Sequence, residues 1–307
     1  MELIVKSTDF PKDKRVICIS DIHGSLDLLR ELLRKVKYAG DDILVLLGDL
    51  YTKGRQGQDT LKYIIELSQN LNVYVLRGNC DWTTEEYLSE SEKAWLDALP
   101  HVMETPQYIF VHGGLPGGTF ETEDAIPYMK NDAYMEQGYK FDKYVITGHW
   151  PTINYAREIP SYNPIIDEES HIIAIDGGNA IVSGGQLNAF IIDNGEFSFE
   201  YAEDLPKRRI LKPQDASEGA MTITWNDRFV ELVEQGEVFS RYRCRKTGNI
   251  LEIPNDRIWT DKWGHLCSAQ WTDYLLPLDA GDEVSVIKDY GSKLLAKKGG
   301  IMGWVVL

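Results

Sequence analysis

Five short apolar runs in the first half of the chain are each closely followed by a residue that is able to bind a metal ion. These runs alternate with stretches of helical spacing, of which residues 26–36 are the clearest. Strands that alternate with helices indicate crossover units and a largely parallel sheet. Fewer helices separate the later runs, so we expect that part to be more antiparallel. The five runs are Arg15–Ser20, Ile43–Leu47, Val73–Leu76, Tyr108–Val111 and Tyr144–Thr147.

Carboxylates, an amide and imidazoles follow these runs. If the runs are neighbouring strands, their polar residues meet at the carboxyl ends of the strands, where open sheets bind ligands. Each residue alone has a simpler explanation, because Asp21 could cap a helix and Asn79 could form a turn. Five such strand ends are improbable by chance, and mixed oxygen and nitrogen donors suit manganese, iron or zinc better than calcium. The expected metal ligands are Asp21, His23, Asp49, Asn79, His112 and His149.

The sequence blocks around these residues read SDIHG, LGDLYTKGR, RGNCDW, VHGGLP and TGHWP. In order and spacing they resemble the motifs of the calcineurin-like metallophosphoesterases, over about residues 14–200. Within that family they look most like the phosphoprotein phosphatase branch, which includes bacterial serine/threonine phosphatases and diadenosine tetraphosphate hydrolases. Pro151 stands where simpler phosphodiesterases carry a second ligand histidine, which favours the phosphatase branch.

The resemblance implies an α/β fold, a two-sheet αββα sandwich with its site at the edge, and a metal-dependent phosphoric ester hydrolase. It implies that Asp21 and His23 hold one of two divalent ions, that Asp49 bridges both, and that the remaining ligands hold the second. Manganese is the expected metal, with iron or zinc as alternatives. Asp49, Asn79 and His112 are accordingly the expected catalytic residues.

Cations near these motifs are candidates for binding the substrate. Lys53 and Arg55 follow the Asp49 motif and could hold phosphoryl oxygens, and Asn79 is expected to contact the same group. Lys130 lies in a long insertion, residues 115–143, where the resemblance places substrate contacts. A long loop beside a site often controls access, and packing of this segment on the sandwich is the equal alternative.

The chain departs from the phosphatase pattern at one pair of residues. Family members typically follow the metal-binding Asn with a histidine that acts as general acid and pairs with an aspartate, whereas this chain has Cys80 and Thr52 at those places. A thiol beside two divalent ions is a poor proton donor, and a general acid is worth roughly a hundred- to ten-thousandfold in rate. We therefore hypothesise a preference for aryl phosphates, nucleotide anhydrides or phosphodiesters over phosphoserine.

Two alternatives to this phosphatase-like hydrolase stay open. A dinucleoside polyphosphate hydrolase or a phosphodiesterase is the alternative within the enzymes. A non-catalytic scaffold that binds phosphorylated ligands is the alternative from another class, and the missing acid pair is its main support. The chain retains all six expected ligands, which favours an enzyme that acts on a phosphorylated small molecule or a phosphoprotein.

The last third of the chain differs in composition, because five of the eight tryptophans lie beyond residue 220. We predict a catalytic domain over residues 1–208, a linker over residues 209–219, which is polar and lacks periodicity, and a small all-β domain over residues 220–307. Short strand-like runs and the Gly-Trp-Val ending make this last domain similar to a bacterial Src-homology-3-like barrel. Trp259, Trp263 and Trp271 could form a groove for a peptide or domain partner, although tryptophans that fill the core are the favoured alternative.

The charge balance excludes several other classes of function. The chain has 32 Lys and Arg against 48 Asp and Glu, a net charge of −16, which argues against binding a nucleic-acid polymer. No apolar run reaches the ~18 residues that cross a bilayer, and the first residues do not resemble a secretory signal. Four cysteines without CxxC spacing fit free thiols. We therefore expect a cytoplasmic protein without a membrane partner.

Overall fold

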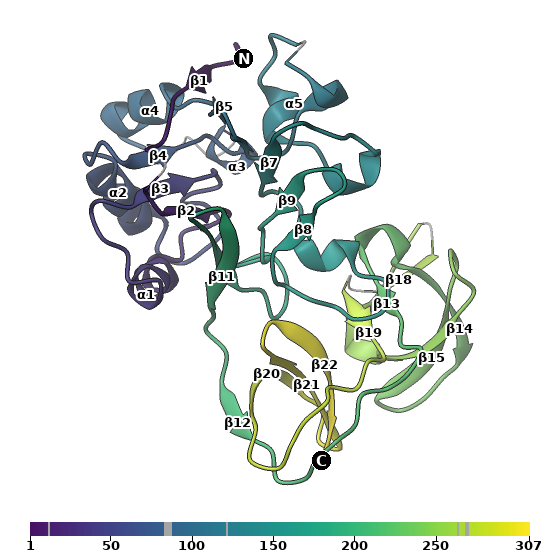
Figure 1. The fold of residues 1–307 in the computed structure, drawn as a ribbon. Coiled ribbons are helices and arrows are strands. Elements are labelled where there is room, and N and C mark those ends of the chain that lie inside the picture. Colours follow the sequence, from purple (N-terminus) through teal and green to yellow (C-terminus); the bar gives the residue numbers. More distant parts are fainter. Residues whose placement is uncertain (12, 83–87, 121, 263, 268–269) are drawn as a thin grey trace. The chain divides into compact units, whose positions relative to one another are not determined.

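A computed structural model describes the chain except for residues 12, 83–87, 121, 263 and 268–269. The chain divides into two compact units, one formed by Met1–Thr152 with Asn163–Asp204 and the other by Ile153–Tyr162 with Leu205–Leu307 (Figure 1). Residues 209–219, expected as a linker, lie within the second unit, where Ile210 is buried in a hydrophobic core. None of the described helices is long and apolar enough to cross a membrane.

The first unit is a sandwich of two mixed sheets. One sheet has the order β11 (Glu196–Ala202), β10 (Leu187–Asp193), β2 (Val16–Ile19), β3 (Ile43–Leu46) and β4 (Val73–Val75), and its last three strands are parallel. The other has the order β1 (Val5–Ser7), β5 (Val102–Glu104), β6 (Tyr108–Val111), β7 (Tyr144–Thr147), β9 (Ile172–Ala174) and β8 (Ile165–Asp167). The later part is more antiparallel than the first, as expected, because β5 and β6, β8 and β9, and β10 and β11 pair antiparallel. Within it, β6, β7 and β9 are nevertheless parallel to one another.

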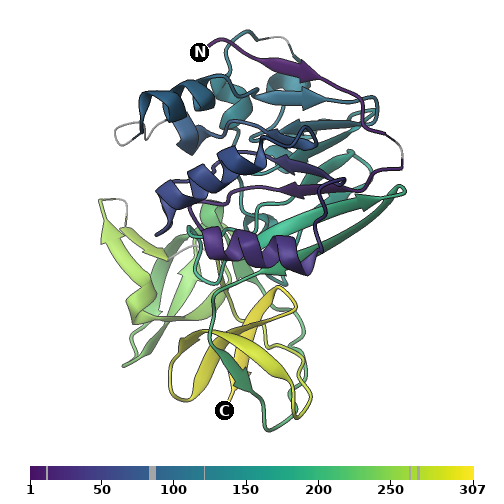
Figure 2. The same ribbon diagram turned by 90° about the vertical axis from the view of Figure 1, so that its left-hand side faces the viewer.

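The strands of the first sheet are buried on both faces. In β2, Ile17 and Ile19 join the core beneath α1 (Leu26–Lys35) and α2 (Gly57–Leu67), whereas Val16 and Cys18 join the core between the two sheets. Both helices lie along the same face of this sheet (Figure 2). Burial on both faces requires an unbroken apolar run, which explains why the sequence predicts these strands well.

The outer face of the second sheet is covered by the described part of the insertion, residues 115–120 and 122–143. Val111 and Val145 of the sheet share a buried core with Leu115, Tyr128 and Tyr134 of the insertion. The structure therefore supports the packing alternative for this segment. The remaining helices of this unit are short: α3 (Asn79–Trp82), α4 (Glu90–Asp97) and α5 (Ile126–Met129), with 3₁₀ turns at Pro116–Gly118 and Tyr134–Gln137.

The second unit is all-β apart from its short 3₁₀ turns. One antiparallel sheet contains β12 (Lys207–Arg209), β20 (Glu283–Asp289), β21 (Lys293–Lys298) and β22 (Ile301–Val306). Another contains β16 (Ile250–Pro254), β15 (Phe239–Cys244), β14 (Phe229–Glu234), β18 (Gly264–Cys267) and β17 (Ile258–Asp261), and β13 (Thr222–Ile223) pairs with β19 (Trp271–Thr272).

Two tryptophans lie in the interior of this second unit. The rings of Trp271 and Trp304 are buried with their centroids 5.2 Å apart, and each indole N–H donates to a backbone carbonyl. Trp271 is therefore a core residue and not part of an open recognition groove. Trp259 is partly exposed, and Trp263 lies outside the described residues.

The ends of β3 and β4 approach so closely that Gly78 has no room for a side chain. A Cβ atom on Gly78 would lie 2.2 Å from Asp49 Oδ1 and 2.4 Å from Asp49 N. We expect Gly78→Ala to lower the free energy of unfolding by roughly 1–3 kcal/mol, the usual cost of overpacking. Gly40→Ala is the matched control, because its Cβ would meet only Asn70 Nδ2, at 3.6 Å. Chemical denaturation measures both variants, and equal stabilities would contradict the expectation.

Candidate metal centre

The predicted ligands lie at the carboxyl ends of parallel strands from both sheets of the first unit. The first sheet carries four of them and the second sheet carries two. Asp21 and His23 follow β2, Asp49 follows β3, Asn79 begins α3 after β4, His112 follows β6, and His149 follows β7. The side chains that the sequence predicts as ligands are thus brought to one edge of the sandwich by short connections after each strand.

Asp49 lies between histidines that come from different sheets. Its Oδ2 is 3.7 Å from Nε2 of His23, and its Oδ1 is 3.4 Å from Nε2 of His112. Asp21 lies on the His23 side, with Oδ1 3.6 Å from the same His23 nitrogen. Asp21, Asp49 and His112 each offer a ligand atom within 4.8 Å of the others. This arrangement suits a carboxylate that bridges two cations.

Asn79, His112 and His149 form the other side of the centre. Nδ1 of His112 lies 2.8 Å from the carbonyl oxygen of Leu47, so that nitrogen donates a proton, and Nε2 keeps a lone pair when the ring is neutral. The oxygen of Asn79 lies 3.2 Å from this Nε2, so two acceptors face each other in the neutral state of the ring. Exchanging the oxygen and nitrogen of the amide would let Asn79 donate to both imidazoles. The other way to satisfy facing acceptors is a cation that both of them bind.

The donor set fits divalent metal ions. Oδ1 of Asp21 is buried and accepts no hydrogen bond in the part of the chain that the structure describes. Carboxylate oxygens, an amide oxygen and imidazole nitrogens together match the preferences of manganese, iron and zinc. A second cluster of possible ligand atoms joins His23 and Asp49 to Sγ of Cys80. The residues present therefore fit a pair of cations on either side of Asp49.

Negative charge accumulates in this buried region. Burial and the Asp49 carboxylate raise the pKa of Asp81 to about 7, and burial and the Asp21 carboxylate raise the pKa of Asp176 well above its usual value. Burial of the His112 ring opposes its charged form, but the carboxylates of Asp49 and Asp21 outweigh burial and raise the pKa of His112. The region therefore stabilises added positive charge.

Several of the candidate ligands have a left-handed backbone conformation. The φ angles are 56° at Asp21, 47° at His23, 54° at Asp49 and 65° at His149. Side chains other than glycine rarely adopt this region, which costs on the order of 1–3 kcal/mol and is found mainly at functional sites. The fold thus holds these four residues in an unfavourable conformation that directs their side chains to one place.

Asp81 fixes the loop that carries Asp49. Its Oδ2 accepts from the backbone N–H groups of Asp49 and Gly78 at 2.8 and 2.9 Å, and its Oδ1 accepts from that of Leu50 at 2.8 Å. The N–H of Cys80 donates to Oδ1 of Asp49 at 2.8 Å. This role of Asp81 was not predicted, because nothing in the sequence around Asn79 indicates hydrogen bonds to the loop of Asp49.

The residues that replace the family's usual acid pair lie in buried surroundings. Sγ of Cys80 is within 4.8 Å of ligand atoms of His23 and Asp49, so the thiol faces the centre. Burial and the Asp49 carboxylate raise the pKa of Cys80. Oγ1 of Thr52 is buried and makes no hydrogen bond to the other described residues.

The cationic candidates for substrate binding do not all lie together. Lys53 and Arg55 line a cavity of about 680 Å³ that is also lined by Gly24, the residue after His23. Lys130 does not line this cavity and is exposed at the end of α5. The insertion that carries Lys130 contributes a different residue, Asp132, whose Oδ1 lies 2.9 Å from Nε2 of His149.

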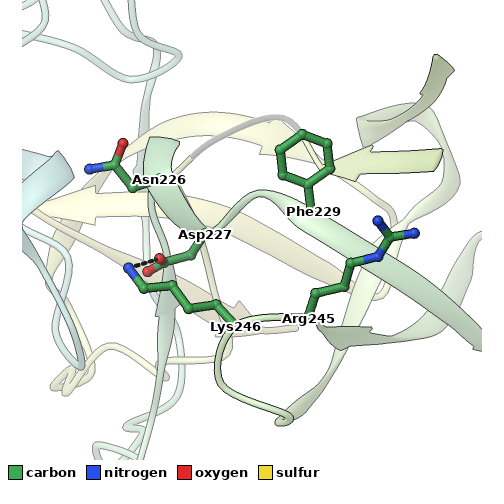
Figure 3. Close-up of a pocket in the computed structure, with 5 residues that line it drawn as sticks. All are labelled: Asn226, Asp227, Phe229, Arg245 and Lys246. Atoms are coloured by element: carbon green, nitrogen blue, oxygen red, sulfur yellow. Dashed lines mark ion pairs between the residues drawn. The ribbon is translucent and has the colours of Figure 1, made fainter. Parts of the chain in front are cut away.

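Another cavity, of about 590 Å³, lies in the second unit. It is lined by Asn226, Asp227, Phe229, Arg245 and Lys246 (Figure 3). Lys246 pairs with Asp227 at 2.6 Å, and Arg245 pairs with Glu231 at 3.2 Å. Its cations already have carboxylate partners and it contains no predicted site residue, so the edge of the sandwich is the better candidate site.

Comparisons with known proteins find similar solved structures and one matching family. The crystal structure of a putative diadenosine tetraphosphatase, 20% identical, aligns over 66% of this chain and 99% of its own with a TM-score of 0.53. A metallophosphoesterase from Sphaerobacter thermophilus aligns over 62% of this chain and 88% of its own, with 18% identity and a TM-score of 0.42. No curated protein matches the chain significantly. The family described as calcineurin-like phosphoesterase matches residues 14–188, more than half of the chain, and the chain belongs to this family.

Proposed function

We propose that the chain is a phosphoester hydrolase with a two-metal centre at the edge of its sandwich. The observation that carries this proposal is the place of Asp49 between the imidazoles of His23 and His112. Membership of the calcineurin-like phosphoesterase family supports metal-dependent hydrolysis of a phosphoester. The scaffold alternative has less support, because a non-catalytic binder has no need for a left-handed backbone at four candidate ligands.

The protein's own groups would fix the geometry of the reaction. Two divalent cations, manganese by preference and iron or zinc as alternatives, would neutralise phosphoryl charge and activate the attacking water when bound. Asp49 would keep its place between the two cation sites because Asp81 holds its loop through three backbone hydrogen bonds. Lys53, Arg55 and Asn79 would bind phosphoryl oxygens, and Lys130 would contact a more distant part of the substrate.

Cys80 and Thr52 support a preference for good leaving groups. A thiol is a weak hydrogen-bond donor, and neither residue offers the imidazole that would protonate an alkoxide. Phenolates and phosphate anhydrides need less protonation, so aryl phosphates, nucleotide anhydrides and phosphodiesters are the proposed substrate classes. A dinucleoside polyphosphate belongs among the tested substrates, since the structure with a TM-score of 0.53 is titled a putative diadenosine tetraphosphatase.

Two further proposals concern the second unit and the location of the protein. We propose that the sheet formed by β12, β20, β21 and β22 represents the Src-homology-3-like part and that this unit serves a peptide or domain partner. The antiparallel pairing of these strands supports the first proposal. A cytoplasmic location is supported by four cysteines that are all free thiols.

Metal loading is the first test of the proposed function. We expect metal analysis of Mn²⁺-loaded protein to find two equivalents, and chelation to abolish turnover of an aryl phosphate. Asp49→Asn removes the bridging charge and should lower kcat by at least about 100-fold. His265→Ala, in the second unit, is the control that should leave kcat unchanged. Neither bound metal nor turnover would favour the scaffold.

The leaving-group preference is tested by three substrates. We expect kcat/KM for an aryl phosphate and for a dinucleoside polyphosphate to exceed that for a phosphoserine peptide. The double variant Cys80→His with Thr52→Asp restores an acid pair, so it should raise phosphoserine turnover by about 10- to 100-fold relative to aryl phosphate turnover. A parent enzyme that prefers phosphoserine by tenfold would refute the preference.

The role of the cations is tested by single alanine variants. Lys53→Ala and Arg55→Ala each remove a charge-assisted hydrogen bond, worth about 1.5–3 kcal/mol, and should raise KM by about tenfold or more. Lys130→Ala should have a smaller effect, because Lys130 lies outside the cavity that Lys53 and Arg55 line. The control is Lys212→Ala, in the second unit. Unchanged KM for both Lys53→Ala and Arg55→Ala would contradict the assignment.

A further inference from the structure

The two nitrogens of the His149 ring face in different directions. Nδ1 lies 2.9 Å from the side-chain atom of Asn79 that also faces His112. Nε2 lies 2.9 Å from Oδ1 of Asp132, in the insertion between β6 and β7. The backbone N–H of His149 donates to Oδ2 of Asp21 at 2.9 Å. His149 is thus held at its backbone by one predicted ligand and at its ring by a residue that is not a predicted ligand.

The contact with Asp132 determines which nitrogen of His149 can bind a metal. An ionised carboxylate only accepts hydrogen bonds, so Nε2 must carry the ring proton. Nδ1 then keeps its lone pair, which is directed at Asn79 and the centre. A carboxylate that accepts from the outer nitrogen of a metal-binding histidine fixes both the tautomer and the orientation of its ring.

Asp132 is itself held in place by the folded insertion. Tyr134, two residues later, is buried, and its ring lies so close to Gly114 that a Cβ there would be 2.5 Å from it. Nε2 of Gln137 donates to the backbone oxygen of Asp132 at 3.1 Å. Ala133 has a left-handed φ of 52°, which turns the chain directly after Asp132. The Asp132 carboxylate therefore lies on an anchored turn of the insertion.

We propose that Asp132 is a positioning residue that holds His149 as a ligand of the second metal ion. The inference rests on the proposed two-metal centre and adds a role for the insertion beyond the expected substrate access or surface packing. Asp132 contacts His149 and not Asp21 or His23, so its loss should weaken one of the two cation sites and spare the other.

The test is a metal titration of the full chain. Asp132→Ala should weaken binding of one Mn²⁺ equivalent by 10- to 100-fold, the usual effect of removing such an outer partner, and leave the other equivalent in place. Asp132→Asn should fall between this variant and the parent, because its amide oxygen still accepts from Nε2 without the negative charge. Asp142→Ala, an exposed carboxylate of the same insertion, is the matched control and should bind like the parent.

Two further measurements separate positioning from a general structural role. Excess Mn²⁺ should restore aryl phosphate turnover to Asp132→Ala, and the thermal midpoint of the metal-free variant should equal that of the metal-free parent. A lower midpoint without a change in Mn²⁺ affinity would overturn the inference. Unchanged affinity in Asp132→Ala, with two ions bound to the parent, would overturn the inference alone. A parent chain that binds no Mn²⁺ would overturn the proposed function and this inference together.

Discussion

Buried carboxylates that lie close together are the constraint on which the rest of the first unit depends. An ionised carboxylate taken out of water is costly unless opposite charge or hydrogen-bond donors surround it. Asp81 meets this requirement with three backbone N–H groups, and Asp49 meets it with the imidazoles of His23 and His112 and the N–H of Cys80. Oδ1 of Asp21 is left without a donor among the described residues. The missing positive charge is what a pair of cations would add.

Each of the two sheets carries some of the candidate ligands, so the geometry of the centre depends on how the sheets pack against each other. Cys18 and Val45 from the first sheet meet Phe110 and Ile146 from the second in one buried core. That core lies directly before the strand ends that carry the candidate ligands. A well-packed core does not adjust freely to changes in volume. The separation of Asp49 from His112 is therefore set by apolar packing several residues away from either side chain.

The sequence predicted the strands that are buried on both faces. β2 and β3 read as unbroken apolar runs because both of their faces are covered. The three-residue strand β1 has exposed side chains and no periodicity, so only its pairing with β5 in space defines it. The parallel pairing of β7 with β9 depends in the same way on the path of the chain between them. No local sequence pattern indicates which strands pair in this way.

The candidate site could likewise be predicted from the sequence only in part, and the structure gives the physical reason. The sequence motifs contain residues that come soon after a strand. The position of the strand determines where such residues lie, so they could be predicted. Asp132 follows no strand and reaches His149 only because Tyr134 anchors the turn after it. The centre is therefore built differently on its two sides. On the side of His23, the next residue, Gly24, helps to line the cavity that also contains Lys53 and Arg55. On the side of His149, the packed insertion contacts the imidazole ring through Asp132, so the proposed ligand geometry there depends on how the insertion packs.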